Sequence, residues 1–251
     1  DGWHQPGFDD TGWDQAVLID QDEVLLTAQQ APPIRVTEEV VPVEINEVKP
    51  GVYVFDFGVN LVGYALLKAE GNPGDTVTMR FAELLHDDGT VAQENLRSAT
   101  ATDRYVFSGE GVENFQPWLT YHGFRYVQVE GLANAPERST LTGLVFHNAA
   151  DPVGEFSCSN DIINAFNGNI KRGQKGNMMS VPTDCPQRDE RLGWMGDAQM
   201  FAPTSCYNMH MARFYDKWMN DITDSQDPEG FVHDVNPAIV VKGPSKPAWG
   251  D

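Results

Sequence analysis

The sequence predicts a multidomain chain in which an antiparallel β-sandwich is followed by a separate helical unit. Residues 34–147 contain short runs rich in Val, Tyr, Phe and Thr, separated by turn residues, which is typical of strands. After Pro152 the apolar residues recur every three or four positions, which is typical of helices. Because strands come first and helices follow without alternation, the pattern favours two units over a doubly wound sheet, with a boundary near residue 150.

Five runs carry the clearest strand signal, because apolar and polar residues alternate along them at least in part. Many short strands at this spacing are best accommodated in a β-sandwich. The stretch between Glu83 and Asp103 lacks clear periodicity, and we interpret it as a long loop. The five runs cover residues 51–58, 63–70, 76–83, 102–107 and 123–130.

Two helices are expected after Pro152. Ser159 or Asn160 can cap the first helix. The second helix is expected to begin near Asp197, with Pro203 in or near its first turns, where a proline is tolerated or bends the helix. Their apolar positions are Ile162, Ile163, Phe166 and Ile170 in the first, and Phe201, Ser205, Tyr207, Met211, Phe214, Trp218 and Ile222 on the buried side of the second.

Charge and hydropathy exclude two classes of partner. The 251 residues contain 17 Lys and Arg against 37 Asp and Glu, so the formal net charge is −20. Such a charge repels phosphate backbones and anionic membranes. The longest apolar stretches are far shorter than the roughly 20 residues that a membrane helix needs. We therefore expect neither a nucleic acid nor a membrane as partner.

The cysteines and one histidine have structural rather than chemical interpretations. Cys158, Cys185 and Cys206 are odd in number and lack the spacing of a metal site, so three free thiols are expected. Cys185 has no histidine near it in sequence and is expected to be a small buried residue. His122 is expected to be a hydrogen-bonded structural histidine of the sandwich.

The residues best suited to chemistry lie between the two predicted helices, from Asp184 to Asp197. This segment holds four carboxylates, two arginines and Trp194, together with prolines and glycines that oppose a continuous helix. Cleavage of a glycosidic bond needs one protonated and one ionised carboxyl group. Crowded carboxylates raise one another's pKa, whereas an arginine keeps its partner ionised, so a mixed cluster can separate the two roles.

Spacing alone leaves alternatives for this segment. A solvated, salt-bridged loop is the competing interpretation, since most charge clusters are surface features. Asp189 and Glu190 are adjacent and compete for the role of acid. Metal binding by the carboxylates is disfavoured, because no histidine lies close in sequence and calcium loops carry a different pattern. No metal and no cofactor are expected.

The segment 181–198, VPTDCPQRDERLGWMGDA, closely resembles the active-site segment of bacterial α-L-rhamnosidases of glycoside hydrolase family 78. The match is long and contiguous. Residues 8–13 are similar, more weakly, to the end of the jelly-roll module that precedes the sandwich in these enzymes. Further stretches that look like family sequence are 53–63, 94–97, 102–105, 120–127 and 247–251.

The resemblance implies a domain organisation. Residues 1–30 would be the end of a preceding jelly-roll module, and residues 31–150 would be the jelly-roll-like β-sandwich domain. Residues 151–251 would be the N-terminal part of a catalytic α/α toroid of six helical hairpins. The sequence starts without Met and stops within a family-like stretch, so we expect it to be a piece of a longer protein, cut through its active site.

The resemblance also implies roles for individual residues. Glu190 would be the general acid that protonates the departing oxygen. The family inverts the anomeric configuration and uses a second glutamate as base, which we expect beyond Asp251, so the isolated chain should be inactive. The implied ligand is a rhamnose-containing glycoside or polysaccharide. Contacts with the terminal rhamnose are implied for Asp184, Arg188, Trp194, Asp197 and Trp249.

A second function stays open from the sequence. The β-sandwich could be a noncatalytic carbohydrate-binding module, with the acidic loop serving a structural purpose. The two hypotheses differ in one respect. An enzyme should gather Glu190, Asp197 and Trp249 around a common cavity, whereas a binding module has no need to do so.

Overall fold

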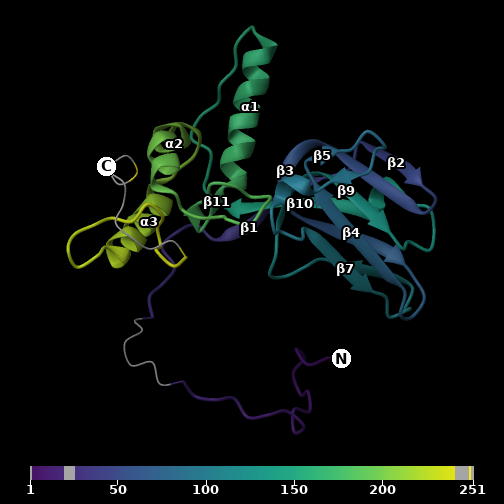
Figure 1. Ribbon diagram of the computed structural model, residues 1–251. Helices are drawn as coiled ribbons and strands as arrows, with labels where there is room; N and C mark the ends of the chain where they lie inside the picture. Colours follow the sequence, from purple (N-terminus) through teal and green to yellow (C-terminus); the bar gives the residue numbers. More distant parts are fainter. Residues whose placement is uncertain (1, 20–25, 241–248, 250–251) are drawn as a thin grey trace.

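A computed structural model describes residues 2–19, 26–240 and 249. Strands and helices are segregated in space as they are along the sequence (Figure 1). Residues 34–148, called the β-domain below, hold the main sheet, and three helices follow in residues 161–225. Every helix within the described ranges is too short or too polar to span a bilayer.

The β-domain is built on one curled antiparallel sheet of eight strands, in the order β1-β10-β3-β9-β4-β7, with β2 and β8 also paired to β3. The first part of β3 lies between β2 and β9, and its last part pairs with β10 and β8. These strands are β1 (Ile34–Val40), β2 (Glu44–Lys49), β3 (Val52–Glu70), β4 (Thr76–Ala82), β7 (Thr102–Val106), β8 (Val112–Phe115), β9 (His122–Glu130) and β10 (Leu141–Asn148).

The core of the β-domain lies inside this curl and explains why the sheet bends. Phe57 and Phe81 both pack edge-on against Phe124, with ring centroids 5.5 and 5.0 Å away. The sandwich-like architecture was predicted correctly. The runs 51–58 and 63–70, however, are not two strands but one, β3, whose register shifts between Asp56 and Leu61.

The stretch between Glu83 and Asp103 is more ordered than predicted. It contains the short hairpin of β5 (Leu84–Leu85) and β6 (Val91–Ala92), followed by a 3-10 turn, η1 (Glu94–Leu96). Leu96 is buried. Its apolar side chain anchors an otherwise polar segment, which periodicity over so few residues cannot reveal. Residues 93–101 are called the β-domain loop below.

The first predicted helix is confirmed as α1 (Asp161–Gly176). Asn160 caps it, because the Asn160 Oδ1 accepts the backbone N–H groups of Ile162 at 3.0 Å and Ile163 at 3.4 Å. Ile162 and Phe166 are exposed. The helix is therefore defined by its cap and spacing more than by contacts on its apolar face.

The second predicted helix is in fact two, α2 (Met195–Asn208) and α3 (Ala212–Ser225). The chain becomes extended at Met209, which forms an isolated bridge with Pro152. Continuous apolar spacing hides this break. Tyr207 is exposed rather than buried, and Pro203 lies well inside α2 rather than in its first turns. Met211, Phe214, Trp218 and Ile222 are buried, as expected.

The remaining expectations on structural residues can be compared directly. All three thiols are free, and Cys185 is buried. His122 is buried, lies 3.0 Å from Asp103 through its Nε2, and stacks on Phe81 at 4.1 Å between ring centroids. These three observations confirm the structural interpretation of His122. Residues 2–19 and 26–30 carry no strand, and the assignment of residues 1–30 to the end of a jelly-roll module stays a prediction.

Candidate active site

The acidic segment forms an ordered loop, residues 183–194, called the site loop below. It follows the short ladder between β11 (Met178–Met179) and β12 (Val181–Pro182) and leads into α2. Its two arms are joined where the Asp184 N–H donates to the Leu192 carbonyl at 3.1 Å. Its end is held by the Asn236 N–H, which donates to the Gly193 carbonyl at 2.9 Å. The predicted ordered loop is therefore present.

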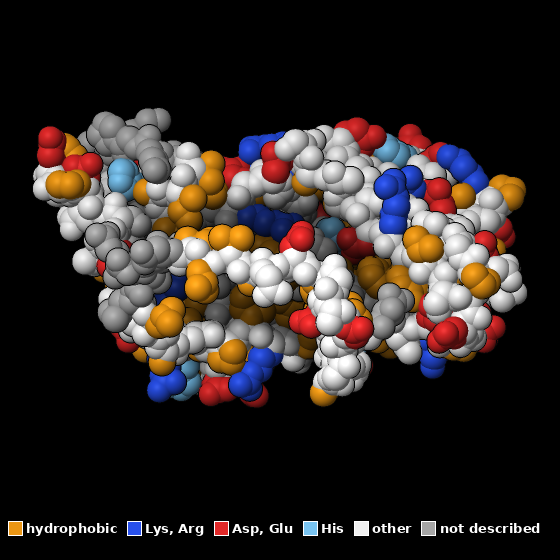
Figure 2. Space-filling model, turned by 90° about the horizontal axis from the view of Figure 1, so that it is seen from below, with side chains coloured by type: hydrophobic (Ala, Val, Ile, Leu, Met, Phe, Trp, Pro, Cys, Tyr) orange, Lys and Arg blue, Asp and Glu red, His pale blue; other side chains and the backbone are white. Residues whose placement is uncertain are grey.

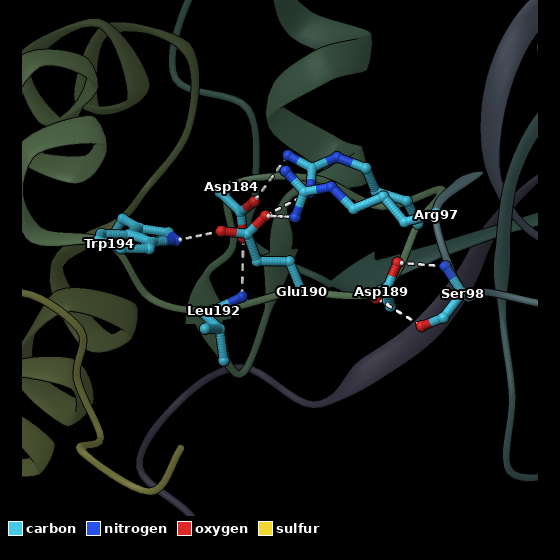
Figure 3. A network of polar contacts seen from close by, with 8 residues as sticks. Arg97, Ser98, Asp184, Asp189, Glu190, Leu192 and Trp194 are labelled. Carbon is cyan, nitrogen blue, oxygen red and sulfur yellow. Dashed lines mark hydrogen bonds and ion pairs between the residues drawn. The ribbon is translucent and has the colours of Figure 1, made fainter. Parts of the chain in front are cut away.

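Glu190 is held at both carboxylate oxygens (Figure 3). The Trp194 indole Nε1–H donates to Oε1 at 3.0 Å. Oε2 receives the Arg188 guanidinium and, at 2.7 Å, the Nη1 of Arg97 from the β-domain loop. The carboxylate is therefore fixed between an aromatic ring on one side and two cations on the other.

Arg188 links Glu190 to Asp184. Its Nη2 lies 3.6 Å from the Asp184 Oδ2, while its Nη1 pairs with Glu190. The other oxygen of Asp184 accepts the Leu192 backbone N–H at 2.8 Å. The side chain of Asp184 is 10% exposed. A nearly buried carboxylate of this kind is stabilised by a cation and a backbone donor on different oxygens.

The surroundings of Glu190 favour its ionised form. The pKa of Glu190 lies below its usual range, mainly because of the hydrogen bond from Arg188. The hydrogen bond from Trp194 and the charges of Arg188 and Arg97 lower it further, whereas burial opposes the shift. The same pairing raises the pKa of Arg188. These contacts thus favour the carboxylate form of Glu190.

Asp189 faces the opposite way from Glu190. Its Oδ1 accepts the Ser98 backbone N–H at 3.1 Å, and its Oδ2 accepts the Ser98 hydroxyl at 2.6 Å (Figure 3). The Ser98 hydroxyl is the main cause that lowers the pKa of Asp189. The two adjacent acids, which spacing alone could not separate, therefore have different partners and different directions.

Two hollows flank the site loop. The larger, with a volume of about 760 Å³, is lined by residues that include Asp184, Asp197 and Trp249. The smaller, of about 480 Å³, lies between the site loop and the β-domain and is lined by residues that include Glu190 and His122. Figure 2 shows a face that is hollowed between the helical part and the β-domain, with hydrophobic and basic side chains inside.

The structure does not place Glu190, Asp197 and Trp249 around one common cavity, as the enzyme hypothesis expected, but divides the expected site residues between two neighbouring cavities. Asp184, Asp197 and Trp249 line the larger cavity, whereas Glu190 borders the smaller one. Asp184 connects the two groups, since it and Glu190 offer ligand atoms within 4.8 Å of each other. Trp194 also connects them: it donates to Glu190, and its ring centroid lies 5.7 Å from that of Trp249.

Trp249 packs so tightly against the start of α2 that only glycine fits there. A Cβ built on Gly196 would lie 2.0 Å from Cε3 of the Trp249 ring. Of the predicted stretch 247–251, Trp249 is the residue within the described part of the chain. Its contact with Gly196 fixes the indole over one wall of the larger cavity.

Asp184, Cys185 and Glu190 could be considered as metal ligands, because their ligand atoms lie within 4.8 Å of one another. The chemistry of this set does not suit a metal. Arg188 already pairs with both carboxylates. Burial, followed by the hydrogen bond with Asp184, raises the pKa of the Cys185 thiol to about 11, so that the thiol stays protonated.

Sequence reasoning missed the contribution of the β-domain to this site. Arg97 and Ser98 contact the site loop, and the Arg191 Nη2 donates to the Tyr121 carbonyl at 2.7 Å. The Arg191 guanidinium also lies 3.8 Å from the centroid of the Tyr121 ring. The signal that could have found Arg97 is the family-like stretch 94–97, which lies within the segment interpreted as a loop.

Comparison with known families gives two adjacent matches. Residues 46–147 match the bacterial alpha-L-rhamnosidase concanavalin-like domain. Residues 151–251 match the bacterial alpha-L-rhamnosidase 6 hairpin glycosidase domain. The first match falls in the β-domain, and the second contains the site loop and the helices α1, α2 and α3.

Individual relatives agree with these matches. An alpha-L-rhamnosidase of Streptomyces avermitilis is 45% identical over 251 residues, which are 100% of this chain and 24% of that protein. Its crystal structure with L-rhamnose superposes with a TM-score of 0.95, at 45% identity, over 100% of this chain and 24% of that one. The chain thus spans about a quarter of the length of this relative.

Two further solved structures are similar over nearly the whole chain. The alpha-L-rhamnosidase of Dictyoglumus thermophilum has a TM-score of 0.95 at 44% identity, over 99% of this chain and 28% of that one. The alpha-L-rhamnosidase of Aspergillus terreus has a TM-score of 0.91 at 38% identity, over 99% and 29% respectively. Both the sheet and the site loop lie within these alignments. The chain therefore belongs to the bacterial alpha-L-rhamnosidase family, and it matches two of its domains, the concanavalin-like domain and the six-hairpin glycosidase domain.

Proposed function

We propose that the full-length protein carrying this sequence is a glycoside hydrolase that releases terminal α-L-rhamnose from a rhamnose-containing glycoside or polysaccharide. One observation carries the proposal. Glu190 is clamped between Trp194 and Arg188, next to a cavity that Asp184, Asp197 and Trp249 line. Carboxylates and aromatic faces in one cavity are the groups that bind a sugar ring, through its hydroxyls and its apolar face.

In this proposal the larger cavity holds the terminal sugar. The Trp249 ring is an apolar wall of this cavity, and the Trp194 ring lies beside it, tilted by 54°. Asp184 and Asp197 would accept hydrogen bonds from sugar hydroxyls, and Arg188 would donate one. A cavity of about 760 Å³ has room for a monosaccharide and the start of its leaving group.

Glu190 would protonate the glycosidic oxygen as the C–O bond breaks. Its carboxylate must first take up a proton, which the two arginines oppose in the empty site. A bound sugar that excludes water and engages Arg188 would weaken this opposition and raise the pKa of Glu190. The proposal therefore couples the filling of the cavity to the protonation of the acid.

The proposed mechanism is inverting, with the base supplied by another carboxylate. Inverting sites hold their two carboxyl groups roughly 6.5–9.5 Å apart, which leaves room for a water molecule. The oxygens of Asp184 and Glu190 lie within 4.8 Å of each other, with Arg188 bound to both, so this pair lacks that room. We place the base in a part of the protein beyond Asp251.

The test is the hydrolysis of an aryl α-L-rhamnoside by the full-length protein, followed by NMR of the anomeric proton. Inversion predicts β-L-rhamnose as the first product, with the α-anomer appearing later by mutarotation. If the α-anomer forms first, the mechanism is retaining, and Asp184 becomes the candidate nucleophile. Absence of turnover, together with binding of rhamnose by the β-domain, would favour the alternative of a noncatalytic binding module.

A further inference from the structure

The β-domain loop is anchored on both sides of Arg97, so it presents this side chain at a defined position. The Gln93 amide donates to the Phe81 carbonyl at 2.9 Å and to the Ala101 carbonyl at 3.0 Å. Leu96 is buried. Arg97 itself has φ 57°, in the left-handed region that residues other than glycine rarely adopt. Such a conformation persists where the surroundings enforce it, often at functional sites.

Two consecutive residues of the β-domain loop pair with two consecutive residues of the site loop, in opposite order. Arg97 donates to Glu190 at 2.7 Å, and Ser98 donates twice to Asp189, at 3.1 and 2.6 Å. The Arg97 side chain is 57% exposed, whereas that of Glu190 is 18% exposed. The cation thus reaches a shielded carboxylate from the open side of the site.

Three side chains of the described part of the chain donate to Glu190, and they differ in the other contacts that hold them. Arg188 is shared with Asp184, and Trp194 belongs to the same loop as Glu190. Arg97 alone among these three comes from the β-domain, 93 residues earlier in the chain. Its contact therefore depends on how the β-domain is seated against the site loop, and it fixes the carboxyl group from outside that loop.

We propose that Arg97 is a positioning residue for Glu190, which orients the carboxyl group and, through its charge, tunes the transfer of the proton to the leaving group. The inference rests on the proposed function, because it requires Glu190 to be the general acid. It gives the β-domain a part in the chemistry of the site, in addition to its role as a scaffold.

The charge of Arg97 acts within a defined set of groups. Among the residues that the structure describes, the titratable and charged groups that contact or closely approach the Glu190 carboxylate are Arg188, Asp184 and Cys185 from the site loop and Arg97 from the β-domain. A nearby cation favours the carboxylate over the carboxylic acid. Removal of Arg97 should therefore make Glu190 hold its proton up to a higher pH, and should also loosen its orientation.

The experiment measures kcat/KM against pH for the full-length protein and its Arg97→Gln and Arg97→Lys variants. Two substrates are compared, p-nitrophenyl α-L-rhamnoside, whose leaving group needs little protonation, and methyl α-L-rhamnoside, whose leaving group needs it fully. Arg104→Gln is the matched control, since Arg104 is an exposed arginine of β7 in the same domain. Far-UV circular dichroism and the Tm verify that each variant is folded.

For Arg97→Gln we expect kcat/KM on the methyl rhamnoside to fall about tenfold, a part of the 10²–10⁴-fold that general acid catalysis typically contributes. On the nitrophenyl substrate kcat/KM should change less than about twofold, because acid assistance matters little there. The alkaline limb of the methyl profile should move to higher pH. Arg97→Lys should restore the position of this limb, and Arg104→Gln should match wild type.

Two results overturn the inference while the proposed function stands. The first is an Arg97→Gln variant that matches wild type on both substrates. The second is an equal loss on both substrates with an unmoved alkaline limb, which would make Arg97 merely structural. A wild-type protein that turns over neither substrate overturns the proposed function itself, and the inference falls with it.

Discussion

The site loop and the β-domain loop meet at Glu190, but they are organised in different ways. Within the site loop, Asp184, Arg188 and Glu190 form a network of close neighbours in sequence. The β-domain loop contributes Arg97 and Ser98 from about 90 residues away. Local networks can be deduced from a motif, whereas contacts between distant loops depend on the fold that brings them together.

The largest effect should separate the two acids of the site loop. Glu190→Gln should lower kcat on a poor leaving group by about 10²–10⁴-fold, because it removes the proton donor. Asp189→Asn should lower it by less than about tenfold, since both carboxylate oxygens of Asp189 are engaged by hydrogen bonds from Ser98. Steady-state kinetics of the two variants are the measurement. If Asp189→Asn lowers kcat more than Glu190→Gln does, Asp189 rather than Glu190 is the general acid.

A smaller effect is expected when a donor within the site loop is removed. Trp194→Phe keeps an aromatic wall but loses the indole N–H that bonds to Glu190 at 3.0 Å. A hydrogen bond to a charged group contributes about 1.5–3 kcal/mol, so kcat/KM should fall roughly 10- to 100-fold. Trp118→Phe, an exposed tryptophan of the β-domain, serves as the control. If kcat/KM of Trp194→Phe equals that of the wild type, the hydrogen bond from Trp194 to Glu190 does not contribute to catalysis.

The pH dependence should distinguish the empty site from the filled site. The alkaline limb of kcat/KM reports the acid of the free enzyme, and that of kcat reports the acid of the complex. Because Arg188, Trp194 and Arg97 lower the pKa of Glu190 in the empty site, we expect the kcat limb to lie at higher pH than the kcat/KM limb. Both limbs describe loss of activity as rising pH deprotonates the acid. If the alkaline limbs of kcat and kcat/KM lie at the same pH, sugar binding does not change the pKa of the acid.

The smallest effect is expected at the second contact between the loops. Ser98→Ala removes the hydroxyl that bonds to the Asp189 Oδ2 at 2.6 Å but keeps the backbone N–H that bonds to its Oδ1. One lost hydrogen bond on an exposed pair should lower kcat/KM by roughly twofold to fivefold. Ser108→Ala, at an exposed serine of the β-domain that bonds to Glu113, is the control. If Ser98→Ala lowers kcat/KM as much as Arg97→Gln does, then packing between the two loops, rather than the charge of Arg97, positions Glu190.

Much of the fold followed from patterns of short range. The strand runs 76–83, 102–107 and 123–130 correspond to β4, β7 and β9, and Asn160 caps α1 as expected. The failures arose where local signals are ambiguous. The separate runs 51–58 and 63–70 suggested two strands, although β3 is continuous and only its register shifts there. Apolar spacing suggested one helix where pairing of Met209 with Pro152 separates two.

The site could be predicted only as far as its residues are neighbours in sequence. The resemblance singled out Glu190, Asp184 and Trp194, and the structure joins them in one network. Periodicity offers no sign of Arg97, because a 3-10 turn anchored by the side chains of Gln93 and Leu96 leaves no repeating pattern. Its partner is determined by tertiary packing, which single-sequence reasoning does not reach.

The close approach of β9 to the site loop limits how such a protein can be re-engineered. A Cβ on Gly123 would lie 2.9 Å from the Cβ of Gln187, so the two segments touch almost backbone to backbone. A transplanted sandwich with any larger residue at that position would push the loop, and Glu190 with it, away from its partners. Chimeras between members of this family should therefore exchange residues 93–101, 121–123 and 183–194 as one unit.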